Sequence, residues 1–162
     1  MGVKSRYTGG MRRADFDAVL LEFESIIHDN GFTGSKGVYR LPNGVQCTFM
    51  LDKFGWDPEL GWGFLLDVQD VTRKDKSRHV PDEFHIQVGP HDLVRTLGRD
   101  AIVGLYADND VMGNRAAGSW FLFDHAERLR SVLRLMLRPA LTHVRTWAES
   151  VHAPTWSGGV VR

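Results

Sequence analysis

Cysteine is almost missing from this sequence: Cys47 is the only one among 162 residues. A single cysteine excludes an intrachain disulfide and a zinc site built from cysteines. Cys47 shares one side of an alternating apolar pattern with Val45 and Phe49, which predicts a buried small apolar residue rather than a nucleophile. The cysteine content fits a reducing compartment, and we expect a cytoplasmic protein.

Long apolar runs and net charge are missing as well. No apolar run approaches the roughly 20 residues needed to cross a bilayer, and the basic segment 1–13 lacks the apolar stretch of a signal peptide. Lys+Arg and Asp+Glu both number 20, so no overall field draws the protein to a membrane surface or to nucleic acid. We therefore expect no membrane partner, and the balance argues against nucleic acid.

Motifs that carry chemistry are absent too. The chain has no phosphate loop, no nucleophile elbow and no His-x-x-x-His pair among its seven histidines. Asp108–Gly113 resembles the start of a calcium loop, but Met112 and Ser119 stand where oxygen ligands are required. We predict no metal site, no cofactor and no catalytic residues, which favours a protein that is not an enzyme.

What the chain does contain is a set of regular apolar patterns. Apolar residues at spacings of three and four predict a helix over residues 14–29, which ends at Asn30-Gly31. Alternating patterns predict strands centred on Tyr39, Thr48, Leu66 and Ile86, the first two joined by a hairpin at Asn43-Gly44.

A second long apolar stripe predicts a helix over residues 125–150, with Asp124 as its N-cap and a kink or break near Arg138 because Pro139 lies inside. The order of elements predicts an α+β domain at residues 14–152: an antiparallel meander sheet with the N-terminal helix and the C-terminal helix, or helix pair, on one face. Residues 1–13 are expected to form a flexible leader, in which Met11 is an alternative start, and residues 153–162 a flexible tail. The expected core is Phe16, Leu20, Phe23, Ile27, Cys47, Phe49, Phe64, Leu66, Leu133 and Met136.

The order of these residues resembles the bacterial family called domain of unknown function 4304. The resemblance covers residues 14–150. Its matching residues are Phe16 to Ile27, Gly31-Phe32, Tyr39-Arg40, Phe49, Phe54-Gly55-Trp56, Gly63-Phe64, Trp120-Phe121 and Leu129 to Trp147. One departure is Leu51-Asp52-Lys53-Phe54, where the family carries a Gln-Lys-Ser-like stretch. The resemblance implies the same helix–sheet–helix order and brings no established catalytic residues.

Three functional hypotheses follow from the pattern of charges. The first is a protein-binding module, of an accessory or immunity type, whose partner surface consists of Arg130, Arg134 and Arg138 together with Trp56, Asp57 and Glu59. Arginines four apart share one helix face and hold carboxylates in two bonds each. The partner's identity and the oligomeric state stay open.

The second hypothesis is a small-ligand binder or enzyme that uses the polar face of the sheet. On that exposed face the alternation places Gln46, Thr48, Asp67, Gln69, His85 and Gln87. His85 would be the acid/base, oriented by Asp67 or Asp52, in a ligand site made of Asp52, Asp67, Gln69, His85 and Gln87. The third hypothesis is nucleic-acid association through the basic segments 1–13 and 73–79 and the arginine ridge.

Overall fold

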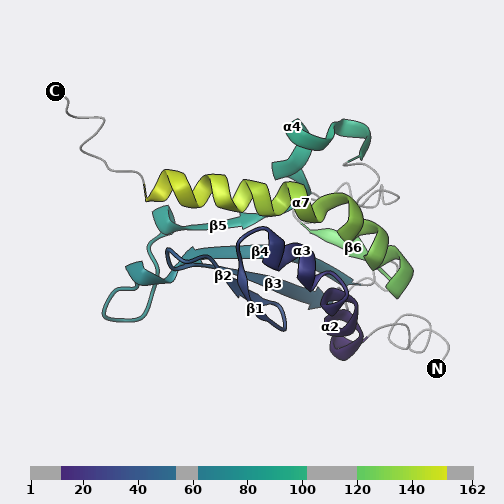
Figure 1. Cartoon of the computed structure of the whole chain (residues 1–162), viewed down its shortest axis with the longest axis horizontal. Coiled ribbons are helices and arrows are strands. Elements are labelled where there is room, and N and C mark those ends of the chain that lie inside the picture. Colours follow the sequence, from purple (N-terminus) through teal and green to yellow (C-terminus); the bar gives the residue numbers. More distant parts are fainter. Residues whose placement is uncertain (1–11, 54–61, 102–119, 153–162) are drawn as a thin grey trace.

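The computed structural model describes residues 12–53, 62–101 and 120–152 (Figure 1). The expected leader and tail lie outside these residues, apart from Arg12 and Arg13. The helices are α2 (Arg13–Leu21), α3 (Glu24–Asp29), α4 (Val94–Leu97) and α7 (Ala126–Val151). The strands are β1 (Thr33–Ser35), β2 (Val38–Arg40), β3 (Val45–Lys53), β4 (Trp62–Asp70), β5 (His85–Val88) and β6 (Phe121–Phe123). Short 3-10 turns lie at Val71–Arg73, Asp82–Phe84 and Pro90–Leu93.

The strands form one antiparallel sheet in the order β1-β2-β3-β4-β5. This order is the predicted meander. The sixth strand, β6, also pairs with β4, on the edge that β5 occupies. β5 pairs with residues 66–69 of β4 and β6 with residues 62–64, so two short strands share one long edge.

The helices α2, α3 and α7 lie on one side of the sheet, and α7 crosses it (Figure 1). Phe16 of α2 contacts Phe64 of β4, with ring centroids 5.6 Å apart. The apolar stripe of α7, from Leu129 to Ala148, is buried against the same face. The α+β fold is therefore confirmed, and all ten residues of the predicted core are at most 7% exposed.

The predicted first helix is interrupted at Glu22 and Phe23. The end of α2 tightens, because the amides of both residues bond the carbonyl oxygens three positions back, and Phe23 leaves the helical region with φ −106° and ψ 3°. Phe23 and Ile27 are nevertheless buried on the far side of the break. The apolar spacing is the same with or without the interruption, so it could not reveal the break.

The helix α7 runs through Pro139 unbroken, and its course bends between its green and yellow halves in Figure 1, in agreement with the kink that was one of the two predicted outcomes. The start of the helix differs from its prediction. Its N-cap is His125 rather than Asp124, and no side chain bonds the cap. The carboxylate of Asp124 accepts a hydrogen bond from the ring of His125 instead.

The turn between β2 and β3 lies at the predicted place, but only Gly44 has a positive φ, of 96°. The tight turn with two positive φ values joins β1 to β2, at Lys36 (54°) and Gly37 (83°). Sequence reasoning missed this hairpin because Thr33-Gly34-Ser35 has no apolar residue to mark a strand.

The outermost strand, β1, is short and irregular. Gly34 has φ 121°, and a Cβ atom there would lie 2.3 Å from the carbonyl oxygen of Val38, so only glycine fits. The ring Nε2 of His28 donates to the carbonyl oxygen of Gly34 at 2.9 Å. A side chain thus occupies one of the backbone acceptors of this strand.

Replacing Leu133 by alanine should lower the free energy of unfolding by about 2–5 kcal/mol, because Leu133 is fully buried and the change leaves a cavity. Leu135 on the same helix is 40% exposed, and Leu135→Ala should change stability by less than about 0.5 kcal/mol. Urea unfolding of both variants measures the difference. Equal losses would show that the stripe of α7 does not face the core.

Candidate functional site

The strand register places one set of polar side chains on the sheet face opposite the helices. Thr48 lies beside Asp67 and Gln46 beside Gln69, while β5 places Gln87 beside Asp67 and His85 beside Gln69. We call these six residues, Gln46, Thr48, Asp67, Gln69, His85 and Gln87, the polar face. The prediction that they share one face is confirmed. The prediction that all are exposed is wrong, because Asp67 is only 7% exposed.

Three side chains surround the carboxylate of Asp67. Nε2 of His85 lies 2.7 Å from Oδ1. The amide of Gln87 donates to the same oxygen at 3.2 Å, and the amide of Gln69 donates to Oδ2 at 2.9 Å. A buried carboxylate is costly without such partners. Both oxygens of Asp67 have one.

Burial and hydrogen bonding act on the pKa of Asp67 in opposite directions. Burial is the largest single influence and raises the pKa, whereas the hydrogen bonds from His85, Gln69 and Gln87 lower it. The bonds together outweigh burial, and the pKa lies below its ordinary value of 3.8. Asp67 is therefore ionised at neutral pH and acts only as an acceptor, so the Nε2–H of His85 is the donor.

This arrangement fixes which nitrogen of His85 is available. Nε2 is taken by Asp67, and Nδ1 has no hydrogen-bond partner among the residues that the structure describes. The side chain of His85 is 30% exposed, so solvent reaches it. In a neutral imidazole whose Nε2 carries the proton, Nδ1 is an acceptor. It can accept a hydrogen bond or take up a proton from a bound group.

The structure brings together four of the five residues of the predicted ligand site: Asp67, Gln69, His85 and Gln87. The backbone of the fifth, Asp52, pairs with Gly63, but its side chain is outside the described part of the chain.

The acidic residue Asp70 does not join this site. It lies three positions after Asp67 in the same strand and therefore on the opposite face. Its side chain is fully buried and accepts hydrogen bonds from the amide and the hydroxyl of Thr72. Burial raises its pKa, but these bonds and the charges of His152 and Arg73 lower it below the ordinary value. In residues 12–53, 62–101 and 120–152, no group of three or more His, Cys, Asp or Glu side chains could hold a metal ion.

His152, at the end of α7, makes a contact that sequence reasoning missed. Its Nε2 lies 3.0 Å from Oδ2 of Asp70. Both atoms are buried and are not aligned as a hydrogen bond, so the contact is electrostatic when the ring is protonated. It attaches the end of the helix to the end of β4. No sequence spacing signals this pair, because the two residues are far apart in the chain.

The predicted arginine ridge divides into two parts. Arg130 is not free, which corrects the prediction: its Nε and Nη2 donate to both carboxylate oxygens of Glu22 at 2.9 Å. Its Nη1 donates to Glu127 at 2.6 Å. The two acids raise the pKa of Arg130 above its ordinary value, Glu22 contributing most. Arg130 therefore joins α7 to the end of α2.

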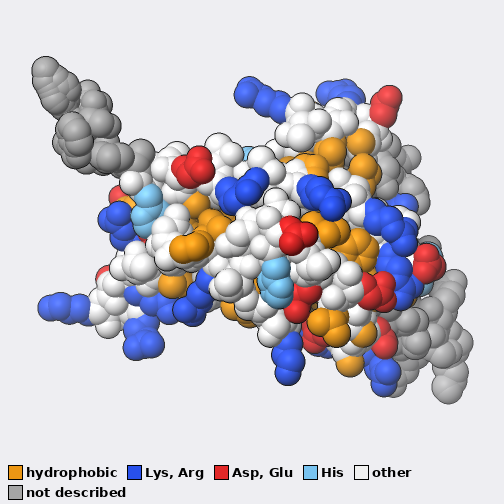
Figure 2. Space-filling model, in the orientation of Figure 1, with side chains coloured by type: hydrophobic (Ala, Val, Ile, Leu, Met, Phe, Trp, Pro, Cys, Tyr) orange, Lys and Arg blue, Asp and Glu red, His pale blue; other side chains and the backbone are white. Residues whose placement is uncertain are grey.

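Arg134 and Arg138 are exposed, and neither forms an ion pair within the described residues. Leu135, between them in sequence, is 40% exposed. In the space-filling view, Lys and Arg side chains are spread along the side of the molecule that α7 covers (Figure 2). Trp56, Asp57 and Glu59, the other members of the predicted partner surface, lie outside the described residues.

Two cavities lie away from the polar face. One of about 260 Å³ lies between α2 and the β1–β2 hairpin, and one of about 290 Å³ lies between the β2–β3 turn and the end of α7. Neither is lined by His85 or Asp67. Cys47 is fully buried, and burial raises the pKa of its thiol, as expected of a core residue rather than a nucleophile.

Compared with family models, with curated proteins and with solved structures, the chain matches none. Among the helices of the described residues, none is long and apolar enough to cross a membrane.

Replacing Asp67 by asparagine should make the free energy of unfolding depend less strongly on pH in the acidic range. The pKa of Asp67 is lower in the folded protein than in the unfolded chain. Its ionised form therefore stabilises the fold above the ordinary pKa, and this contribution is lost as the pH falls through the folded-state pKa. Near neutral pH the variant should lose about 1.5–3 kcal/mol, the usual contribution of hydrogen bonds to a charged group. Urea unfolding at a series of pH values measures both effects.

Asp70 titrates in the same direction, so Asp67→Asn should reduce the acid dependence without removing it. Asp29→Asn, at an exposed position, is the control. If the free energy of unfolding of Asp67→Asn fell as steeply with falling pH as that of the wild type, the lowered pKa of Asp67 would be contradicted.

Reversing the charge of Arg130 should destabilise the protein, whereas reversing that of Arg134 should not. Arg130→Glu places a third carboxylate beside Glu22 and Glu127, and we expect a clearly lower melting temperature. Arg134→Glu removes no ion pair of the described residues and should leave the melting temperature nearly unchanged. Equal melting temperatures for the two variants would refute the structural role of Arg130.

Proposed function

We propose that the protein is a protein-binding module that recognises its partner through the polar face of the sheet. The observation that carries this proposal is the network on Asp67, which holds His85, Gln69 and Gln87 in fixed positions on two rigid strands. Side chains that are already ordered lose little conformational entropy when a partner binds. The network therefore presents preorganised hydrogen-bonding groups.

The shape of the surface favours a macromolecular partner over a small molecule. Small ligands bind in concave sites, and neither cavity described above includes His85 or Asp67. The polar face spreads over three neighbouring strands instead, and a typical protein interface covers about 800 Å² on each partner. Arg40 is exposed at the β2 end of this face and bonds Gln46 of β3 at 2.9 Å, which extends the polar surface to a fourth strand.

A second candidate surface on α7 is favoured by the exposure of Arg134 and Arg138. Leu135 is exposed on the same helix, and a cationic pair near an apolar side chain suits an acidic protein partner. This surface lies on the opposite side of the molecule from the polar face, so substitutions can separate the two candidates.

Capture from lysate of the native host tests both surfaces together. The bait is the whole chain, as wild type, as Gln87→Lys on the polar face and as Arg134→Glu on α7, with melting temperatures measured for all three. We expect the proteins identified by mass spectrometry to be retained by Arg134→Glu and lost with Gln87→Lys, because the introduced lysine would place a new charge on the exposed β5 side of the polar face.

The opposite pattern would move the interface to α7. Retention by both variants would show that neither surface binds the partner, and recovery of no protein above background with the wild type would count against a binding module.

A further inference from the structure

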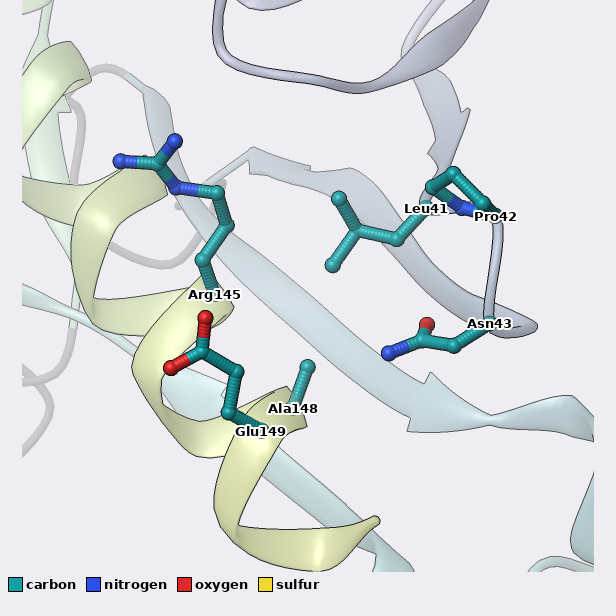
Figure 3. Close-up of a pocket in the computed structure, with 6 residues that line it drawn as sticks. All are labelled: Leu41, Pro42, Asn43, Arg145, Ala148 and Glu149. Carbon is teal, nitrogen blue, oxygen red and sulfur yellow. The ribbon is translucent and has the colours of Figure 1, made fainter. Parts of the chain in front are cut away.

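The cavity of about 290 Å³ between the β2–β3 turn and the end of α7 combines an apolar wall with two opposite charges (Figure 3). Its lining residues are Leu41, Pro42, Asn43, Arg145, Ala148 and Glu149. In Figure 3 the side chains of Leu41 and Asn43 extend from the turn toward the helix, Ala148 faces them, and the carboxylate of Glu149 lies near the base of the Arg145 side chain. Two segments far apart in the sequence thus form the walls.

The two charges are neighbours that do not neutralise each other. Arg145 and Glu149 are four residues apart on one helix, a spacing at which opposite charges ordinarily pair. In the structure they form no ion pair with each other, and Nη2 of Arg145 instead lies 3.5 Å from the hydroxyl of Thr142. Figure 3 shows the guanidinium turned away from the carboxylate. A cation and an anion therefore border the same cavity, each with capacity for a ligand.

The wall formed by the turn is rigid. The amide of Leu41 donates to the carbonyl oxygen of Val45 at 2.9 Å. The amide of Gly44 donates to the carbonyl oxygen of Leu41 at 3.0 Å. Oδ1 of Asn43 accepts from the amide of Val45 at 3.2 Å, which leaves the NH₂ group of Asn43 available to the cavity. The turn thus holds its backbone and the side chain of Asn43 in place without a ligand.

The wall formed by the helix is attached to the same end of the sheet. His152, one turn beyond Ala148, contacts the buried carboxylate of Asp70 at 3.0 Å. The carbonyl oxygen of Gly44 accepts from the amide of Val71, the residue after Asp70, at 3.3 Å. Both walls are therefore fixed to the end of β4, and the width of the cavity is set by the fold.

We propose that this cavity binds a free α-amino acid with an apolar side chain. The carboxylate of the amino acid pairs with Arg145 and its ammonium group with Glu149. The apolar side chain packs on Leu41 and Ala148. A cavity of this size suits a small metabolite, and a zwitterion pairs with both charges at once, whereas a simple anion or cation would use only one of them.

Titration of the isotope-labelled full chain with L-leucine, followed by NMR, tests the proposal. We expect saturable shifts of the backbone amides of Leu41, Asn43 and Ala148. N-acetyl-L-leucine lacks the ammonium group and L-leucinamide lacks the carboxylate. Each should bind about tenfold more weakly or worse, because each loses a hydrogen-bonded charge.

Variants then assign each charge to its partner. Arg145→Gln removes the partner of the ligand carboxylate, so this variant should bind leucine no better than it binds leucinamide. Glu149→Gln removes the partner of the ligand ammonium group, so this variant should bind leucine no better than it binds N-acetyl-leucine. Arg95→Gln, an exposed position on α4 outside the cavity, should bind leucine as the wild type does. Absence of saturable shifts up to the solubility limit of leucine, or equal binding of all three probes, would overturn the proposal.

Discussion

The ring of Phe64 is the contact on which the two layers of this fold depend. It lies within 6.2 Å, between centroids, of the rings of Phe16, Phe49, Phe121 and Phe123, which belong to α2, β3 and β6. These elements are distant in the chain, and each brings an aromatic side chain to the same point. Offset and tilted rings at such distances attract beyond the area that they bury. The cluster therefore holds the first helix, the centre of the sheet and the late strand β6 in one core.

The sequence was sufficient for those parts of the fold that depend on periodicity. The alternation in residues 45–51 and 63–71 reflects strands with one apolar face, and the stripe from Leu129 onward reflects a helix on a core. The sequence was insufficient where contacts between distant parts of the chain determine the local structure. The break at Glu22 leaves Phe23 and Ile27 buried, and it occurs where Glu22 pairs with Arg130, more than a hundred residues away. The strand β1 has no apolar residue and was missed for that reason.

The sequence predicted four residues of the candidate site, but not how deeply each of them is buried. Successive side chains of a strand point to opposite faces of the sheet. This alternation places Asp67, Gln69, His85 and Gln87 on one face and Asp70 on the other. The alternation does not predict that Asp67 is enclosed by its neighbours while His85 stays partly open to solvent. The cavity at Arg145 and the contact of His152 with Asp70 depend on how the end of α7 meets a distant turn, which no local pattern encodes.

The short strand β1 also limits how this protein can associate with others. In the described sheet it is one of the two edges, where an unpaired strand normally offers its backbone to another chain. Here the carbonyl of Gly34 is already occupied by His28, and the backbone on either side adopts positive φ values. An extended strand cannot stay in register along such an edge. A partner that approaches this edge therefore has to recognise side chains rather than extend the sheet.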